Sequence, residues 1–150
     1  MSCEALIYFK SGRVRESQAP RSVDPVGAFR FGHAFPRLIG QMDRSARELG
    51  VAEPSRFVWH DPIDDEGELD KVSAGEFEAL RRKHEATKFW VPLDEGIRTF
   101  AALAGRHELR PEFGTPTDLE HALAFEVACF HAALRDAAAE GEDAFHIQCY

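Results

Sequence analysis

The chain has few cysteines and no long hydrophobic run. Its 150 residues include three cysteines, Cys3, Cys129 and Cys149, far apart in the sequence. Reduced thiols are the simplest interpretation of an odd number, so we expect a cytoplasmic protein; a disulfide between Cys3 and Cys149 stays open if the end strands are neighbours. No stretch approaches 18 uninterrupted apolar residues, so no membrane-spanning helix is expected. The first residues lack the basic start and the cleavage site of a signal peptide.

Positive charge is also scarce, and it is unevenly spread. The chain has 18 Lys and Arg against 26 Asp and Glu, a net charge of −8. Residues 1–40 hold six bases and three acids, whereas residues 41–150 hold twelve bases and twenty-three acids, a balance of −11. Such a surface repels phosphate backbones, so we expect no nucleic acid ligand. It favours a basic protein partner, although acidic surfaces also simply keep many proteins soluble.

Metal and cofactor motifs are missing as well. His84 and His107 are each followed by glutamate, as in the zinc-protease pattern H-E-x-x-H, but Lys88 and Pro111 stand where the second histidine belongs. No cysteine pair has the C-x-x-C spacing, and neither the dinucleotide-binding G-x-G-x-x-G nor the hydrolase G-x-S-x-G occurs. The sequence predicts no metal, no cofactor and no recognisable catalytic motif.

What is present predicts an α+β fold in a single domain spanning residues 1–150. Five residues from Ala5 to Phe9 favour a strand, and Gly12 suits the turn of a β-hairpin over residues 4–17. Strands near 56–60 and 144–149 should complete a small, mainly antiparallel sheet. About four helices should pack against it. They are expected after Pro36, over about 74–89, after Asp94 (burying Ile97, Phe100, Ala101 and Ala104), and over about 117–140.

The last of these helices is the most apolar. Leu123, Val127, Phe130 and Leu134 recur along one stripe, and small or aromatic residues widen it. A helix with so few polar positions is typical of one packed on more than one side. We therefore expect this long C-terminal helix to be central and its stripe to be buried.

Two alternatives for a small-molecule site remain open. His60 and Asp61 follow a predicted strand, and His146 lies on another; together they are the best candidates for an enzyme site assembled from scattered residues. Adjacent strand residues point to opposite faces, so His60 and Asp61 need not touch. The other alternative is a ligand pocket beneath the aromatic segment from Phe29 to Phe35, although those rings more simply anchor a loop to the core.

An acidic run with embedded apolar residues follows Trp59. Residues 61–70 contain six carboxylates, and the run is typical of an exposed loop. Apolar side chains within a carboxylate cluster could both attract and anchor a basic protein. We therefore predict a partner-binding surface made of Trp59, Asp61, Ile63, Asp64, Asp65, Glu66, Glu68, Leu69 and Asp70.

In length, charge and order of elements the chain resembles the small acidic immunity proteins that bacteria produce alongside secreted toxins. The resemblance covers the whole chain only in these general features. It implies a non-enzymatic protein that inhibits a basic toxin by covering its active site. No diagnostic motif accompanies it, so no functional residue is carried over, and the oligomeric state is left open.

Overall fold

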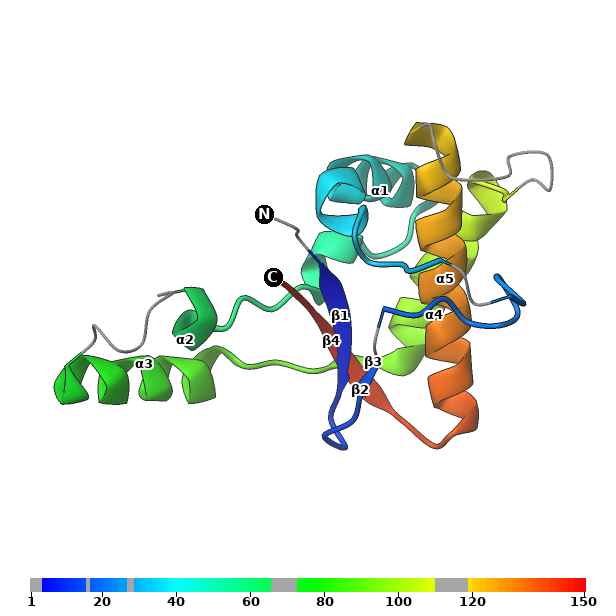
Figure 1. Cartoon of the computed structure of the whole chain (residues 1–150). Helices are drawn as coiled ribbons and strands as arrows, with labels where there is room; N and C mark the ends of the chain where they lie inside the picture. Colours follow the sequence, from blue (N-terminus) through cyan, green and yellow to red (C-terminus); the bar gives the residue numbers. More distant parts are fainter. Residues whose placement is uncertain (1–3, 16, 27–28, 66–72, 110–118) are drawn as a thin grey trace.

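The computed structural model describes residues 4–15, 17–26, 29–65, 73–109 and 119–150, and of residues 64 and 65 the backbone alone. These residues form the predicted α+β fold, with a four-stranded antiparallel sheet and four α-helices of fourteen residues or more (Figure 1). Along the chain the elements are β1 (Ala5–Phe9), β2 (Val14–Arg15), α1 (Phe35–Leu49), the 3-10 helix η1 (Pro54–Phe57), α2 (Pro62–Asp65), α3 (Ala74–Thr87), β3 (Val91–Pro92), α4 (Leu93–Arg106), α5 (Leu119–Ala139) and β4 (Ala144–Cys149).

The sheet has the order β2-β1-β4-β3, so the two ends of the chain meet at its centre. Strands β1 and β4 pair in register from Ala5 with Cys149 to Phe9 with Phe145. The predicted hairpin is confirmed: β1 pairs with β2, and Gly12 supplies the turn with a φ of 100°. Cys3 lies outside the described residues, so its pairing with Cys149 stays untested.

The strand predicted near 56–60 is wrong. Residues Pro54–Phe57 form η1, and Val58 makes a single parallel bridge with Ile147. The edge of β4 nearer its start is already occupied by β3, through Val91 opposite Phe145, which leaves little edge for another strand. Strand β3 itself was not predicted. Its Pro92 has no N–H to donate, which an edge strand tolerates.

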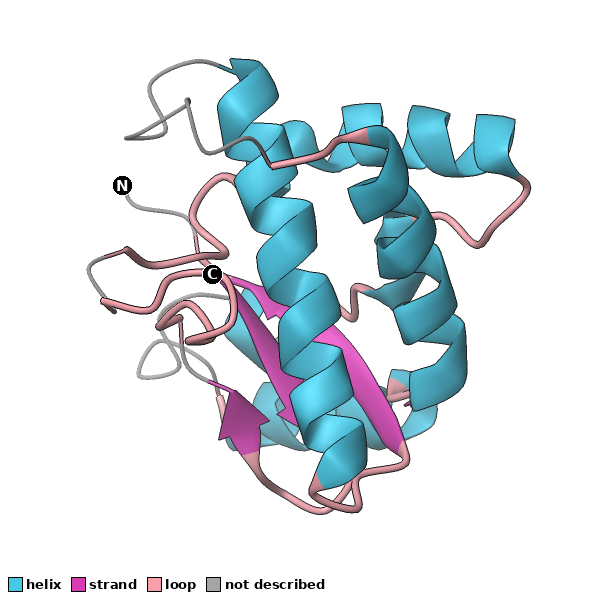
Figure 2. Cartoon of the chain, turned by 90° about the vertical axis from the view of Figure 1, so that its right-hand side faces the viewer, coloured by secondary structure: helices cyan, strands magenta, loops and turns pink. Residues whose placement is uncertain are grey.

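Helices α1, α4 and α5 lie on one side of the sheet (Figures 1 and 2). The stripe of α5 is buried as predicted, with Leu123 4% exposed and Phe130 fully enclosed. On α4, Phe100 is buried as expected, but Ala101 is exposed because it lies about 100° further around the helix. Among the described residues, no helix is both long and apolar enough to cross a bilayer.

The segment before α1 is anchored to α5 by aromatic rings, as expected. Phe31 and Phe35 pack against Phe130, with ring centroids 5.1 and 4.8 Å away. From α5, the Glu126 carboxylate accepts the backbone N–H of Gly32 at 2.7 Å and that of Ala34 at 3.1 Å. Glu126 thereby caps the start of α1, where the side chain of Ala34 cannot.

Helices α2 and α3 project from the opposite side of the sheet, and we call residues 61–88 the arm (Figure 1). The predicted start of α3 is confirmed, since the Ser73 hydroxyl accepts the Glu76 N–H at 3.2 Å. None of the fourteen residues of α3 is buried, and Phe77 is 40% exposed. The sheet and helices α1, α4 and α5 form the body, and helices α2 and α3 of the arm lie outside it.

Candidate functional site

The arm joins the sheet at a group of aromatic and basic side chains that we call the junction cluster. Along β4, Phe145 and Ile147 point into the helix layer, so His146 and Gln148 point to the other face of the sheet. On that face His146 meets Trp59 from the end of η1 and Trp90 from the start of β3. The junction cluster comprises Trp59, His84, Lys88, Trp90 and His146.

His146 is the buried centre of the cluster, with no exposed surface. Its ring stacks on Trp90, with centroids 4.4 Å apart and an angle of 26° between the planes, and contacts Trp59 at 5.0 Å. Burial lowers the pKa of His146; its hydrogen bond to the Phe89 carbonyl opposes this shift, and the nearby Lys88 ammonium, a smaller influence than that bond, lowers the pKa further. The imidazole is therefore neutral at pH 7.

A hydrogen-bonded chain fixes the tautomer of this neutral ring. Nδ1 donates to the Phe89 carbonyl at 3.0 Å, so Nε2 accepts from the Gln148 amide at 3.0 Å. The Gln148 carbonyl accepts the Tyr150 hydroxyl at 2.7 Å, and the hydroxyls of Tyr150 and Tyr8 contact each other. Both tyrosines lie nearer the surface than His146. This series of hydrogen bonds holds the His146 imidazole in one orientation against the indole rings.

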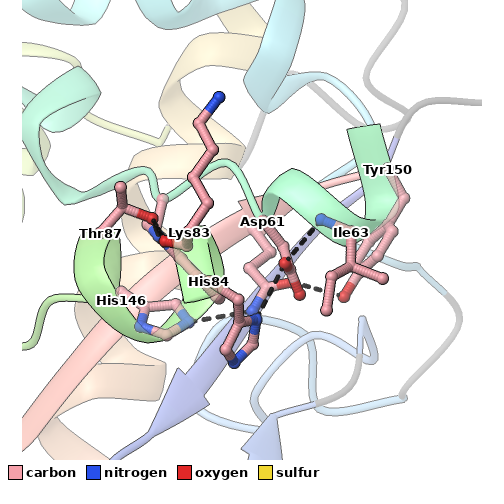
Figure 3. A network of polar contacts seen from close by, with 9 residues as sticks. Asp61, Ile63, Lys83, His84, Thr87, His146 and Tyr150 are labelled. Atoms are coloured by element: carbon pink, nitrogen blue, oxygen red, sulfur yellow. Dashed lines mark hydrogen bonds and ion pairs between the residues drawn. The ribbon is translucent and has the colours of Figure 1, made fainter. Parts of the chain in front are cut away.

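Asp61 and His84 connect the start of the arm to the end of α3 (Figure 3). The Asp61 carboxylate lies 2.9 Å from His84 Nδ1 and also accepts the Ile63 N–H at 3.0 Å. The exposed fraction of the Asp61 side chain is only 13%. The His84 ring in turn meets the Trp59 indole edge-on at 5.0 Å. Asp61 thus links the start of the arm to the last turn of α3.

Lys88 lies above the two indole rings. Its ammonium is 5.8 Å from the centroid of Trp59 and 5.3 Å from that of Trp90, within the range of a cation–π contact with each. Lys88 also ends α3, its N–H donating to the His84 carbonyl. The side chain thereby ties the end of the arm to the sheet.

A hollow of about 340 Å³ opens beside the cluster. His60 is exposed there, whereas Asp61 contacts His84 and His146 is enclosed by the indoles. No hydrogen bond joins these three predicted catalytic candidates to one another within the described part of the chain. The residues that line the hollow are Val58, Trp59, His60, Pro62, Lys83, Thr87 and Phe89.

The predicted partner-binding residues are only partly described. Trp59 is 4% exposed, and Ile63 is half-buried. The prediction of an open loop over residues 61–70 is wrong at its start, because Pro62–Asp65 form α2; Pro62 suits a helix's first turn. Asp64 and Asp65 lie in that helix. Glu66, Glu68, Leu69 and Asp70 lie outside the described residues.

Sequence reasoning missed Lys88, Trp90 and Gln148 as members of this site. The alternating pattern of residues 144–149 does place His146 and Gln148 on one face, so this pair could have been predicted from the sequence. The approach of Trp90 and Lys88 depends on how the arm returns to the sheet, for which no local pattern exists. Among the described residues, no group of histidine, cysteine and acidic side chains is arranged to hold a metal ion.

Comparisons with protein-family models, with curated proteins and with solved structures found no match for this chain. The geometry of the arm and of the junction cluster is therefore the ground on which a function is proposed.

Proposed function

We propose that the chain is a non-enzymatic domain that binds a basic partner protein through its arm. The observation that carries the proposal is that α3 has fourteen residues, none of them buried. Isolated helices shorter than about 12–15 residues are marginal in water, and most helices in proteins gain their stability from packing. A helix held outside the core in this way contributes little to folding, so we infer that it serves an interface.

The charge of the arm selects the partner. The arm, residues 61–88, contains nine acids against five lysines and arginines, a net charge of −4, and its acids are concentrated in residues 61–78, which hold eight of them against one lysine. The first turn of α3 is the end of the helix further from the sheet (Figure 1). Glu76 lies in that turn and is exposed. A concentration of one sign raises the association rate with a partner of the opposite sign. Half-buried Ile63 and exposed Phe77 supply apolar contacts among these charges.

In its specific form, the proposal makes the partner a toxin and the chain its cytoplasmic inhibitor. Support comes from the size, the acidic charge and the α+β layout, which resemble those of immunity proteins. An inhibitor of this kind is encoded beside its toxin, so the neighbouring gene should encode a basic secreted protein. A neighbouring gene for an enzyme of small-molecule metabolism would contradict the proposal that the partner is a toxin. Binding through the arm would then be tested separately.

The test of arm binding uses two variants of equal charge. The arm variant carries Asp64→Asn, Asp65→Asn, Glu66→Gln and Glu68→Gln. The control carries four changes at carboxylates exposed on the body: Asp94→Asn, Glu108→Gln, Glu120→Gln and Asp136→Asn. Each variant has a net charge of −4, from −8 plus four. A partner isolated from the native host is then measured against both variants by stopped-flow association.

We expect the arm variant to associate about tenfold more slowly at low salt, and its rate to depend less on ionic strength. The control should keep most of the wild-type rate, because its charges lie on the body. Equal rates for the two variants would show that only net charge matters and would refute the arm as the binding surface.

A second candidate, favoured by the Asp61–His84 contact beside the hollow, is a small-molecule site there. It predicts that a ligand found by screening raises the melting temperature of the wild type but not of His60→Ala and Lys83→Ala. Such a result would favour the small-molecule site over arm binding, because neither His60 nor Lys83 is one of the acidic residues of the arm.

A further inference from the structure

We propose that Trp59 and Trp90 form a cation-binding seat that Lys88 occupies in the free chain, and that a lysine or arginine of the basic partner takes its place. The inference rests on the proposed function and names one part of its surface. It commits to a single occupant, the cationic side chain of a protein.

The geometry of Lys88 shows what the seat accepts. Its ammonium lies within 6 Å of both indole centroids, the range in which the ring quadrupole attracts a cation. Tryptophan attracts cations best among the aromatic residues. The imidazole of His146 contacts both indole rings and is neutral, so it does not repel a cation bound to them.

The position of the seat favours exchange. Lys88 is exposed and is the residue that ends α3, so its side chain can leave the rings without displacing the helix. The Trp59 ring that its ammonium covers is 4% exposed. The Asp61 carboxylate, close enough to influence His146, supplies a negative charge near the seat. A basic partner lying along the arm would reach the seat at its inner end (Figure 1).

The chain provides its own reporter, because Trp59 and Trp90 are its only two tryptophans. The experiment titrates intact protein with Nα-acetyl-lysine methylamide and follows tryptophan fluorescence at constant ionic strength. Nα-acetyl-norleucine methylamide, which keeps the alkyl chain and lacks the ammonium, is the uncharged comparator. Wild type is compared with Lys88→Gln. Arg82→Gln is the matched control: it removes one positive charge from α3 at a side chain that is 80% exposed.

Competition with Lys88 sets the expected size of the effect. An exposed cation–π contact shifts an equilibrium by about two- to fivefold, so the seat is free in only a fraction of wild-type molecules. Lys88→Gln should therefore reach half-saturation at an about three- to sixfold lower concentration of the lysine probe. Arg82→Gln should match the wild type, and the norleucine probe should give no saturable change in any protein.

Equal half-saturation in wild type and Lys88→Gln, or equal responses to the lysine and norleucine probes, would overturn the seat. The titration involves neither the partner nor the acidic residues of the arm. A negative titration therefore does not refute arm binding. Conversely, equally slow association of both four-amide variants refutes arm binding but not the seat. Circular dichroism of Lys88→Gln confirms that the variant is folded before it is titrated.

Discussion

Helices α5 and α3 are both long, and neither has one apolar and one polar face, yet for opposite reasons. The middle of α5 is apolar around most of its circumference, and eleven of its residues are buried, because α4 and the sheet pack against it. The surface of α3 is polar around most of its circumference, and none of its residues is buried. Helix α5 forms the centre of the core, whereas the surface of α3 is available to another molecule.

The two helices also differ in what stabilises them. Phe130 of α5 contacts the rings of Phe31, Phe35 and Phe100. In α3 the contributions are the Ser73 cap, the ion pair between Arg81 and Glu78 at 3.3 Å and, at the end nearer the sheet, the contacts of the junction cluster. An N-cap contributes about 1 kcal/mol and an exposed helical pair about 0.3–0.5 kcal/mol. Stability should thus depend strongly on α5 and weakly on α3.

The largest expected effect tests this difference directly. Phe130→Ala should lower the free energy of unfolding by about 3–5 kcal/mol, because a fully enclosed ring is replaced by a cavity. The matched change in the arm, Phe77→Ala, should cost less than about 0.5 kcal/mol, since Phe77 is 40% exposed. Urea unfolding of both variants measures the two costs. Similar costs would mean that α3 is part of the core after all.

The body could largely be predicted from sequence because its signals are local. The apolar stripe from Leu123 to Leu134, the turn at Gly12 and the alternation after Ala144 each define an element without knowledge of the rest. The cap at Ser73 likewise placed the start of α3 correctly. The strand near 56–60 failed because its pairing depends on how the segment meets the edge of β4, where Val91 and Pro92 pair with the first two residues and Val58 makes only one bridge, with Ile147.

The junction cluster could be predicted only in part. Its members come from three separate segments, and the contacts of Trp90 and Lys88 arise where the arm returns to the sheet. Glu126 illustrates the same difficulty within the body. Nothing near it in sequence signals that a helical glutamate caps a segment more than ninety residues earlier.

Glu126 provides the second test, which contrasts a buried carboxylate of the body with an exposed one of the arm. Burial raises the pKa of Glu126 from 4.5 to about 7, against the opposing effects of the Gly32 and Ala34 N–H groups and of Arg37. The folded state therefore binds this proton more tightly than the unfolded state does. The resulting stability is full below about pH 4.5 and is lost as the pH rises through about 7.

A shift of this size corresponds to about 3 kcal/mol as an upper limit. Glu126→Gln should remove this contribution, so that wild type loses stability relative to the variant between pH 5 and 7.5. Chemical unfolding at half-unit steps of pH measures the difference. Glu76→Gln, at an exposed position of the arm, is the control and should run parallel to the wild type. Parallel curves for Glu126→Gln as well would contradict the proton assignment.

The smallest expected effects come from one substitution made in each region. Gly96 of α4 faces the core, where a Cβ would overlap the ring of Phe145 and press on Leu134. Phe145 is fully enclosed and packs against Phe57, so its ring has little room to move. Gly96→Ala should therefore cost about 1–3 kcal/mol through overpacking, despite the better helix propensity of alanine.

Gly75 lies in the first turn of α3, and a Cβ there meets no atom within 4 Å. Alanine should favour the helix by less than about 1 kcal/mol, and less still near a helix end. Because α3 contributes little to the core, global stability should stay within about 0.5 kcal/mol of the wild type, while amide exchange within α3 slows. A loss above 1 kcal/mol in Gly75→Ala would mean that the start of α3 packs against the body. In that case α3 would be a structural helix, and the arm could no longer be proposed as the free surface that binds a partner.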